Sequence, residues 1–454
     1  MEKYDIYPNK ANLISSIEKN VTGRNNSIYY LLRFLNSQDD SWSIAINCSW
    51  GSGKTFFVKQ CKLMIDSLNV TKSDEQIDPK LTTALNILCN KNSNNQEAIS
   101  QRPFRTAYYD AWAHDSDTDP IISILQCLSN SLRGAKAREQ LNNALKLGMA
   151  ILNATTWVDL STLQDLIESK NNDLEALKEK FNSTLSKLAP AHGKLLIFVD
   201  ELDRCKPTYA VKLLERIKHY FSNQNVSFIF SVDLDQLQHT IKHYYGSNFA
   251  GYEYLDRFFD LVINLPEPDM DKYFANTKDI LKVAELFNND THNYYQDFCG
   301  ELINHFSFSL RQLNHFYLKS NSSSYNLIAR SLQGEWSSDN GLFIIYTFLL
   351  PLMNALNQAN AHEFNRFIAG KASDDTLNIL TNSKNFSRYY TDISDDKAHV
   401  DVSQGARQIY NAIFGPDTNR SLIISRQCII DNPKICREIL IDACNLLSST
   451  SKLD

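Results

Sequence analysis

A short glycine-rich stretch from Asn47 to Gln60, NCSWGSGKTFFVKQ, carries the clearest chemical signal in the chain. The pattern G-x-x-x-x-G-K-[ST] is typical of loops that bind the phosphates of a nucleotide. Gly53, Lys54 and Thr55 fit this pattern, whereas Cys48 stands where its first glycine is expected. That glycine mainly eases the turn from strand to loop, so we expect a small cysteine there to leave phosphate binding intact.

The residues of this loop have separate expected roles. Backbone N–H groups of such a loop form a nest for anions, and the helix that follows adds the positive end of its dipole. Lys54 would contact the β- and γ-phosphates, and the Thr55 hydroxyl would bind Mg²⁺. The alternative is a glycine turn that holds no ligand. The predicted nucleotide contacts come from Trp50, Gly51, Ser52, Gly53, Lys54, Thr55 and Phe56.

An acidic pair provides the second half of a nucleotide site. The run LLIFVDELDRC reads as a buried strand that ends at Asp200. Asp200 would hold Mg²⁺ through water, and Glu201 would orient or deprotonate the attacking water. An ordinary acidic cap is the alternative, because Asp203 also precedes Pro207 and an amphipathic segment. Since the glycine loop lies upstream, we predict that the pair belongs to a site that hydrolyses nucleotide as well as binding it.

Strands and helices alternate around these two motifs. Apolar runs rich in β-forming residues predict the strands, and helical periodicity between them predicts the connections. The strands are expected at 42–47, 104–112, 194–200, 226–233 and 261–266. Strands that alternate with helices imply a parallel α/β sheet with right-handed crossovers.

Three parts are expected along the chain. Residues 1–268 read as the nucleotide-binding core, with a helical insertion at about 120–190. Residues 269–330 read as a helical lid or sensor region, and 331–454 as a helical C-terminal domain whose role the sequence does not indicate. No strand is expected after about residue 268, where the apolar runs that predict strands stop.

The composition favours a soluble cytoplasmic protein. The formal net charge of −6 speaks against a mainly electrostatic nucleic-acid binder, although a local basic patch remains possible. Nine scattered cysteines without a C-x-x-C pair indicate reduced thiols. The longest apolar run, Gly341 to Leu356, is shorter than the ~20 residues that a bilayer requires, and Pro351 interrupts it. We therefore expect a buried helix there and no membrane segment.

Five motifs in the order found here resemble the KAP family of P-loop NTPases. They are CSWGSGKT, YYDAWAHDSDTDPIISIL, VDELDRCKP, SVDLDQL and GYEYLDRFFDLVINLPEP, within about residues 20–320. The chain departs from the family at Cys48, at Asp110 (Asp-Ala-Trp in place of Asn-Ala-Trp) and at Glu201, where a second aspartate is common. The resemblance implies an α/β fold: a P-loop NTPase core with a mainly parallel five-stranded sheet, a helical insertion and a mainly α-helical C-terminal region. It also implies ATP and Mg²⁺ as ligands.

The resemblance implies further site residues, three of them with an ordinary alternative. Asp233 stands where such NTPases sense the γ-phosphate, or it caps a helix. Arg204 would stabilise charge on the transferred phosphoryl group, in the same or a neighbouring subunit, or form a structural salt bridge. Arg257 would act on a neighbouring subunit. Arg311 would reach back to the γ-phosphate, or be a solvated helix charge, and Arg24 would lie close to the adenine.

The aromatic residue in the Asp-Ala-Trp segment, Trp112, is interpreted more plainly. An aromatic side chain at a strand end more often joins the core than forms a platform for a base, so we expect Trp112 in the core.

The resemblance implies a regulated switch rather than a metabolic enzyme. Some members carry membrane segments between the two nucleotide motifs, whereas the insertion in this chain has charged amphipathic helices. Soluble bacterial members are associated with phage exclusion and defence operons. The first hypothesis is therefore an ATP-hydrolysing switch that forms a homo-oligomer and acts on a protein partner encoded nearby. The alternatives are an ATP-binding scaffold with little turnover and, less favoured by the acidic balance, a nucleic-acid-stimulated ATPase.

Overall fold

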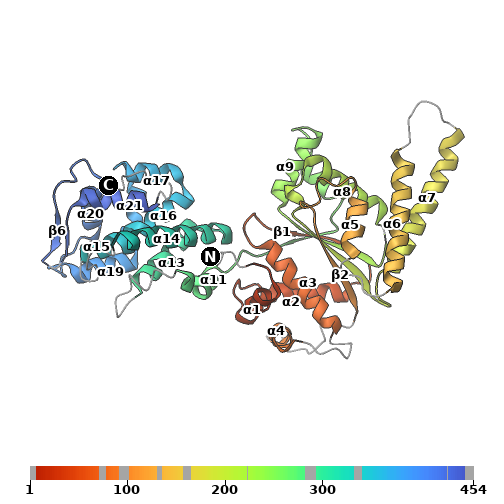
Figure 1. The fold of residues 1–454 in the computed structure, drawn as a ribbon, viewed down its shortest axis with the longest axis horizontal. Helices are drawn as coiled ribbons and strands as arrows, with labels where there is room; N and C mark the ends of the chain where they lie inside the picture. Colours follow the sequence, from red (N-terminus) through yellow and green to blue (C-terminus); the bar gives the residue numbers. More distant parts are fainter. Residues whose placement is uncertain are drawn as a thin grey trace. The chain divides into compact units, whose positions relative to one another are not determined.

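In the computed structural model, the described residues form two compact units (Figure 1). The N-terminal unit ends at Pro268, and the C-terminal unit comprises the described residues from Asp269 onward. The described residues are 7–70, 78–90, 102–129, 135–156, 165–221, 223–281, 293–331, 340–426 and 428–444.

A five-stranded parallel sheet forms the centre of the N-terminal unit, in the order β2-β3-β4-β1-β5. The predicted fold class is therefore confirmed. The second strand ends two residues earlier than expected, because the chain turns after Asp110. Since β4 lies between β1 and β3, its carboxyl end lies between the ends of the two strands that carry the glycine loop and the acidic pair. The strands are β1 Ser43–Asn47, β2 Phe104–Asp110, β3 Lys194–Asp200, β4 Val226–Val232 and β5 Leu261–Asn264.

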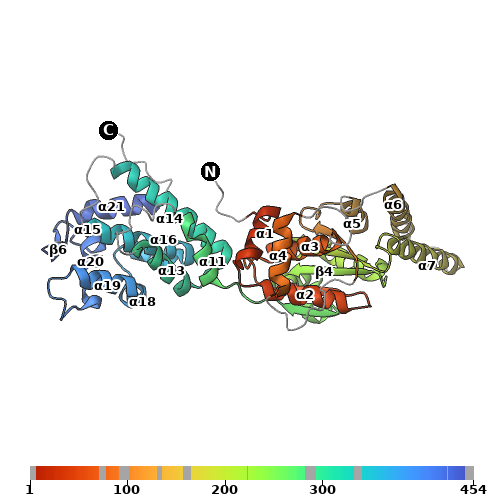
Figure 2. The ribbon, with the colours of Figure 1, turned by 90° about the horizontal axis from the view of Figure 1, so that it is seen from below.

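Helices cover both faces of this sheet (Figures 1 and 2). One face packs against α1 Lys10–Lys19, α2 Asn25–Ser37, α3 Lys54–Val70 and α4 Pro79–Asn90. The other face packs against α5 Pro120–Ser129, α6 Ala135–Thr156, α7 Asp165–Ser186, α8 Pro207–Tyr220 and α9 Leu234–Tyr245. Two short elements, η1 Leu202–Arg204 and α10 Gly251–Leu255, complete the unit. The predicted insertion corresponds to α5, α6 and α7, of which α6 and α7 lie side by side.

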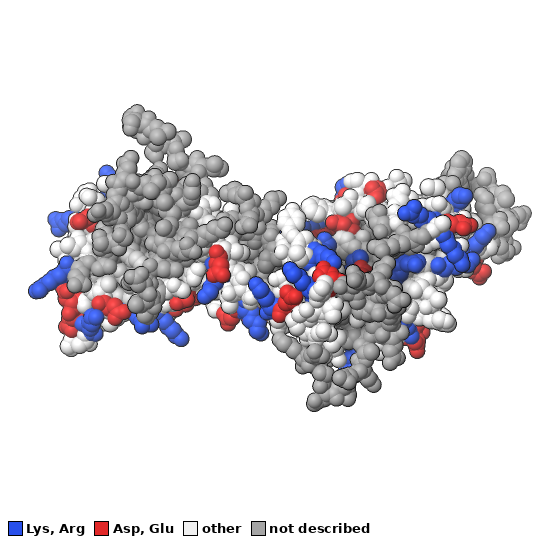
Figure 3. Space-filling model, turned by 60° about the horizontal axis from the view of Figure 1, so that its bottom comes forward, with Lys and Arg blue, Asp and Glu red and all other residues white. Residues whose placement is uncertain are grey.

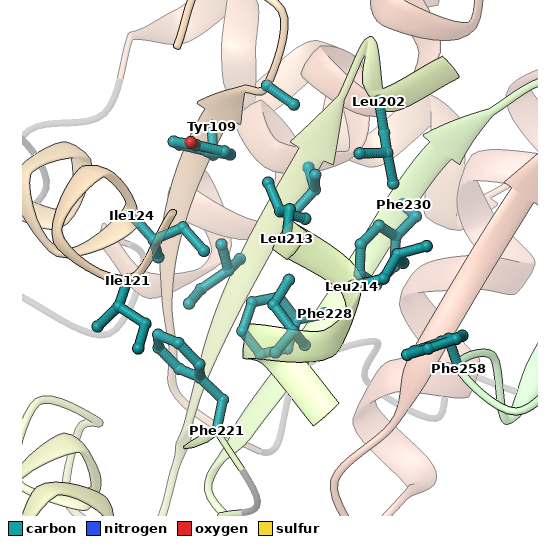
Figure 4. Close-up of a cluster of buried hydrophobic side chains, with 14 of the residues drawn as sticks. Tyr109, Ile121, Ile124, Leu202, Leu213, Leu214, Phe221, Phe228, Phe230 and Phe258 are labelled. Carbon is teal, nitrogen blue, oxygen red and sulfur yellow. The ribbon is translucent and has the colours of Figure 1, made fainter. Parts of the chain in front are cut away.

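Aromatic side chains fill the core between the sheet and α8 (Figure 4). Phe228 of β4 packs edge-on against Phe221, with ring centroids 5.5 Å apart, and Phe230 packs similarly against Phe259 at 5.2 Å. All residues of β3 and β4 are buried, as expected for strands covered on both faces. Truncating such a buried phenylalanine to alanine typically costs about 3–5 kcal/mol, so this core fixes the strands whose ends carry the site.

The C-terminal unit is mainly helical, as predicted, but it also contains a small sheet. The strands β6 Leu422–Ser425 and β7 Cys428–Ile430 pair antiparallel, with Ile423 opposite Ile429. The expectation of helix and loop alone after residue 268 is therefore wrong here. Each strand is too short to show the alternating pattern by which strands are recognised in a sequence.

The helices of this unit begin directly after Pro268. They are α11 Met270–Thr277, η2 Lys278–Ile280, α13 Tyr294–Phe306, α14 Leu310–Ser331, α15 Asn340–Ile344, η3 Ile345–Leu349, α16 Leu350–Ala359, α17 Ala361–Ile368, α18 Asp374–Asn382, α19 Lys384–Ile393, α20 Val402–Phe414 and α21 Pro433–Cys444.

The longest apolar run continues as a helix through Pro351. Proline lacks the N–H of a helical hydrogen bond and crowds the preceding turn, and the chain accommodates it with a π-helical turn, η3, directly before it. The resulting apolar helix, Gly341–Ala359, has 19 residues, so that by length and composition alone it could cross a membrane, unlike the shorter run expected from the sequence. Because 72% of its most apolar stretch is buried inside the protein, this helix is consistent with the predicted buried helix.

Candidate nucleotide-binding site

The glycine loop connects the end of β1 to the start of α3. Gly51 and Gly53 have φ angles of 82° and 88°, in the left-handed region that residues other than glycine adopt only at a cost. The hydroxyl of Ser52 donates to the carbonyl oxygen of Ser49 at 2.7 Å, so the loop closes on itself. Lys54 is the first residue of α3, so the loop opens onto the N-terminus of a 17-residue helix. A strand, a tight glycine loop and a helix N-terminus together form the predicted setting for phosphate binding.

Cys48 and Lys54 define the two ends of the loop. Lys54 is buried, and its Nζ donates to the carbonyl oxygens of Cys48 at 2.6 Å and Ser49 at 3.2 Å. The Cys48 N–H donates to Val232 O at 3.2 Å, and its thiol donates to Leu265 O at 3.5 Å. The cysteine therefore joins the loop to the ends of β4 and β5.

The acidic pair lies directly beside the loop. Asp200 is buried at the end of β3, where its Oδ2 accepts a hydrogen bond from the Tyr108 hydroxyl at 2.8 Å. Its Oδ1 accepts from the Glu201 N–H at 3.0 Å, and Glu201 has a φ of 60°. Glu201 Oε1 lies 3.4 Å from Thr55 Oγ1. Burial, and after it the charge of Asp200, raises the pKa of Glu201, while Arg204 opposes this shift. Two motifs almost 150 residues apart in the sequence thus meet in one site.

A third carboxylate, Asp203, connects the loop to the end of β4. Its Oδ2 accepts hydrogen bonds from Trp50 Nε1 and, at 3.1 Å, from the Asp233 N–H. Asp233 Oδ2 in turn accepts from the Trp50 N–H at 3.1 Å, and its Oδ1 accepts from Gln236 N at 3.2 Å as the cap of α9. Burial raises the pKa of Asp203, against the effects of the Trp50 hydrogen bond and of Lys54. The capping alternative for Asp233 is therefore observed, and its role as a sensor stays a prediction.

Arg204 lies beside Glu201 and close to two tryptophans. Its Nε lies 2.6 Å from Glu201 Oε2, and its Cζ lies 6.0 Å from the ring of Trp50 and 5.6 Å from that of Trp112. The expectation that Trp112 joins the core is wrong, because 53% of this residue is exposed. It lies in the turn beyond the end of β2.

A family model, the KAP family P-loop domain, matches residues 24–322. The chain belongs to this family. A search of the curated proteins found no match. Among solved structures, the Orc1 protein of Aeropyrum pernix in complex with DNA resembles the chain, with 12% identity over 92% of this chain and 91% of that one. Its TM-score of 0.30 is too low to support any inference.

Arg24 fastens the loop of the KAP domain to the residues that follow β5. It is 3% exposed, and its Nε donates to Pro266 O at 2.8 Å while its Nη1 donates to Ser52 O at 2.7 Å. Burial lowers the pKa of Arg24, although nearby Cys48 and Glu267 oppose the shift. The predicted proximity of Arg24 to the adenine stays a prediction.

An apolar cavity of about 360 Å³ lies next to this arginine. Pro266, which accepts the hydrogen bond from Arg24, lines it together with residues of α2, α3, β1 and β5. The other lining residues are Ser27, Tyr30, Leu31, Phe34, Ile46, Phe57, Ile263, Asn264 and Leu265. Phe56, a predicted nucleotide contact in the first turn of α3, is half-buried and does not line this cavity.

Two further predicted arginines, Arg257 and Arg311, belong to the KAP domain. Arg257 is exposed and precedes β5, whose neighbouring Asp260 N–H donates to Ser43 O at the start of β1. Because β1 and β5 are parallel, Arg257 lies at the opposite end of the sheet, about 15 Å from the loop at ~3.3 Å per residue. Its predicted action on a neighbouring subunit stays open to test. Arg311 is exposed in the C-terminal unit, and its contact with the γ-phosphate stays a prediction.

Two polar residues at the strand ends, Asp110 and Ser231, were not among the predicted site residues, although they flank the predicted Asp200. Asp110 pairs in register with Asp200, and Asp200 with Ser231, across β2, β3 and β4. The Ser231 hydroxyl is buried and has no hydrogen-bond partner among the described residues. A signal was available, since each is a polar residue near the carboxyl end of a predicted parallel strand.

Oxygen-bearing side chains at the start of α3 and at the strand ends are of the kind that binds Mg²⁺. The Thr55 hydroxyl, the Asp200 carboxylate and the unpartnered Ser231 hydroxyl are all hard oxygen ligands. Within the part of the chain that the structure describes, no cluster of three His, Cys, Asp or Glu side chains could hold a metal by itself. Mg²⁺ is commonly held by one or two carboxylates together with phosphate oxygens, so this sparse donor set suits a metal that arrives with a nucleotide.

Proposed function

We propose that this KAP domain hydrolyses ATP with Mg²⁺ and serves as a regulated, oligomeric switch in a bacterial defence complex in the cytoplasm. The observation that carries the proposal is the approach of Glu201 Oε1 to Thr55 Oγ1 at 3.4 Å, which puts a candidate base at the loop. A phosphate-binding turn without catalytic function would not require a half-buried carboxylate at this point.

Each residue of the site has a role in the proposed reaction. Lys54 contacts the β- and γ-phosphates from the start of α3, and the loop N–H groups hold the remaining oxygens. Thr55 and Asp200 hold Mg²⁺, which neutralises charge that develops on the phosphates. Glu201 accepts a proton from the attacking water, and its raised pKa makes it a stronger base than an exposed glutamate. Asp233 senses the γ-phosphate from the end of β4.

The proposed switch depends on contacts that a γ-phosphate would alter. The Trp50 N–H is bound to Asp233 and its indole N–H to Asp203, so the loop, β4 and the acidic segment move together. A phosphate seated in the loop would bias this connected set between two arrangements. In the proposed homo-oligomer, Arg257 completes the site of a neighbouring subunit, and a protein partner encoded nearby reads the nucleotide state. Arg311 would report that state to the C-terminal unit.

The apolar cavity beside Arg24 is our proposed place for the adenine. A purine is flat and apolar on its faces, and cavities for such ligands are lined mainly by apolar side chains. Tyr30 and Phe34 of α2 line it opposite Ile263 of β5.

An ATP-binding scaffold with little turnover is the second candidate. It is favoured by the fact that Lys54 and Glu201 both have partners within the protein, the loop carbonyls and Arg204 respectively. A nucleic-acid-stimulated ATPase is less favoured, because the net charge is −6 and the described Lys and Arg residues are interspersed with Asp and Glu on the face in Figure 3.

Phosphate release by the purified protein with Mg²⁺-ATP tests the proposal. Glu201→Gln should bind ATP and release phosphate at least about a hundredfold more slowly, since a general base typically contributes 10²–10⁴-fold. Glu253→Gln, an exposed glutamate of α10, is the matched control and should behave as wild type. ATP binding without release by the wild type would favour the scaffold. Wild-type turnover in Glu201→Gln would place the base elsewhere.

A further inference from the structure

The guanidinium of Arg204 lies close to the rings of two exposed tryptophans, Trp50 and Trp112. Trp50 and Trp112 are 43% and 53% exposed, although burying an indole is strongly favourable. The face of an aromatic ring attracts a guanidinium, and Arg204 Cζ lies within about 6 Å of both ring centres. The two rings therefore restrict where this arginine can place its hydrogen-bond donors.

The arginine held in this way points at the candidate base. Arg204 Nε lies 2.6 Å from Glu201 Oε2, and these side chains are only 25% and 20% exposed. With Oε2 fixed, Oε1 is the oxygen that faces Thr55 Oγ1 at 3.4 Å. Glu201 also keeps a left-handed backbone conformation, which is unfavourable for a non-glycine residue and requires support from its surroundings.

The turn that carries Trp112 is fastened to the same strand ends. The Ala111 N–H donates to Asp200 O at 2.9 Å, and the Ala113 N–H donates to Asp110 Oδ1 at 3.0 Å. These bonds lie on both sides of Trp112, so the backbone that carries its indole is fastened to the ends of β2 and β3.

We infer that Trp112 is a positioning residue for ATP hydrolysis: with Trp50 it holds Arg204, and Arg204 aims the Glu201 carboxylate at Thr55 and the nucleotide. This inference rests on the proposed function. It pairs Arg204 with Glu201 rather than with a phosphate, and it gives the exposed Trp112 a role that the sequence did not indicate. The indole touches no reacting atom, so its effect should appear in turnover and not in nucleotide affinity.

Steady-state kinetics test the positioning role. Trp112→Ala should lower kcat about tenfold with KM for ATP unchanged, because a misaimed base costs rate rather than binding. Arg204→Ala should lower kcat at least as much, and the double variant should be no slower than Arg204→Ala. Trp112→Phe, which keeps an aromatic face, should restore most of the rate. Tyr252→Ala, equally exposed at 53%, is the control and should turn over as wild type.

Several results would overturn the inference. One is a kcat of Trp112→Ala equal to that of the wild type. Another is a double variant whose kcat falls by the product of the two single reductions. A loss of kcat that Trp112→Phe does not restore would contradict a role for the aromatic face.

A measurement without nucleotide separates this inference from the proposed function. In protein labelled with 5-fluorotryptophan, Arg204→Ala should shift the fluorine resonances of Trp50 and Trp112 and leave that of Trp42, which packs on Phe34, in place. An unmoved Trp112 resonance would overturn the contact itself. If these shifts occur but the wild type releases no phosphate, the proposed hydrolysis fails and the positioning role fails with it. If the wild type releases phosphate but Arg204→Ala shifts neither resonance, the inference is refuted and the proposed function stands.

Discussion

The two ends of the parallel sheet use polar residues differently. At the carboxyl ends of the strands, Asp200, Glu201 and Asp203 lie close together, and burial raises the pKa of the last two. At the amino ends, polar side chains connect segments of backbone: Asp260 Oδ2 accepts from the Ser43 N–H at 2.8 Å, and Lys194 donates to Asp40 O.

Candidate reactive groups thus gather at the carboxyl ends of the strands, whereas the polar groups named at the amino ends hold backbone segments together. The amino ends contain a larger cavity, about 460 Å³, lined by aromatic residues such as Trp42, Phe228 and Phe258. No concentration of like charges lies around it among its lining residues. Ligands of open α/β sheets bind outside the carboxyl ends, where loops and helix N-termini converge. Cavity size alone would therefore point to the amino ends, away from the candidate nucleotide site.

The largest expected effect comes from the carboxyl end. Lys54→Ala should abolish ATP binding, because it removes the charge that faces the β- and γ-phosphates. Calorimetric titration with ATP measures this directly. Lys62→Ala on the same helix, where Lys62 pairs with Asp66 at 2.7 Å, is the matched control and should bind as wild type. Tight ATP binding by Lys54→Ala would remove the basis for placing the nucleotide at the loop.

An intermediate effect is expected from Arg257, which lies at the amino ends of the strands and is proposed to act on the site at the carboxyl ends in a neighbouring subunit. If Arg257 acts in trans, wild-type specific activity should rise steeply with protein concentration, and Arg257→Ala should lower the plateau by about 10³-fold, as for an arginine finger. Lys218→Ala changes another exposed cation at the amino ends and should leave the plateau unchanged. If Arg257→Ala leaves the plateau of specific activity unchanged, the amino ends of the strands have only a structural role.

The smallest expected effect on activity comes from the amino end. Asp260→Ala removes the acceptor for the Ser43 N–H and should destabilise the N-terminal unit by about 1 kcal/mol, the typical net value of one hydrogen bond. Turnover at 25 °C should stay within twofold of wild type. Urea denaturation followed by circular dichroism measures the loss, and a large fall in kcat without a loss of stability would erase the distinction between the ends.

Local sequence patterns determined the elements of the site. The glycine loop, the continuous apolar runs and the acidic pair each occupy a few adjacent residues, so their meaning does not depend on distant parts of the chain. The five strands, the parallel sheet and the helical C-terminal region could therefore be predicted. The short strands β6 and β7 could not, because three or four residues carry too little pattern.

Only the tertiary structure decided how these elements meet. The sequence did not indicate that β4 lies between β1 and β3, and this order places Ser231 and Asp233 between the loop and the acidic pair. It also did not indicate that Trp112 is exposed and contacts Arg204, since the two lie on different strand-end turns. The physical reason is that strand order and side-chain contacts arise from packing between segments far apart in the chain. Composition and periodicity describe each segment, whereas the site depends on which segments become neighbours.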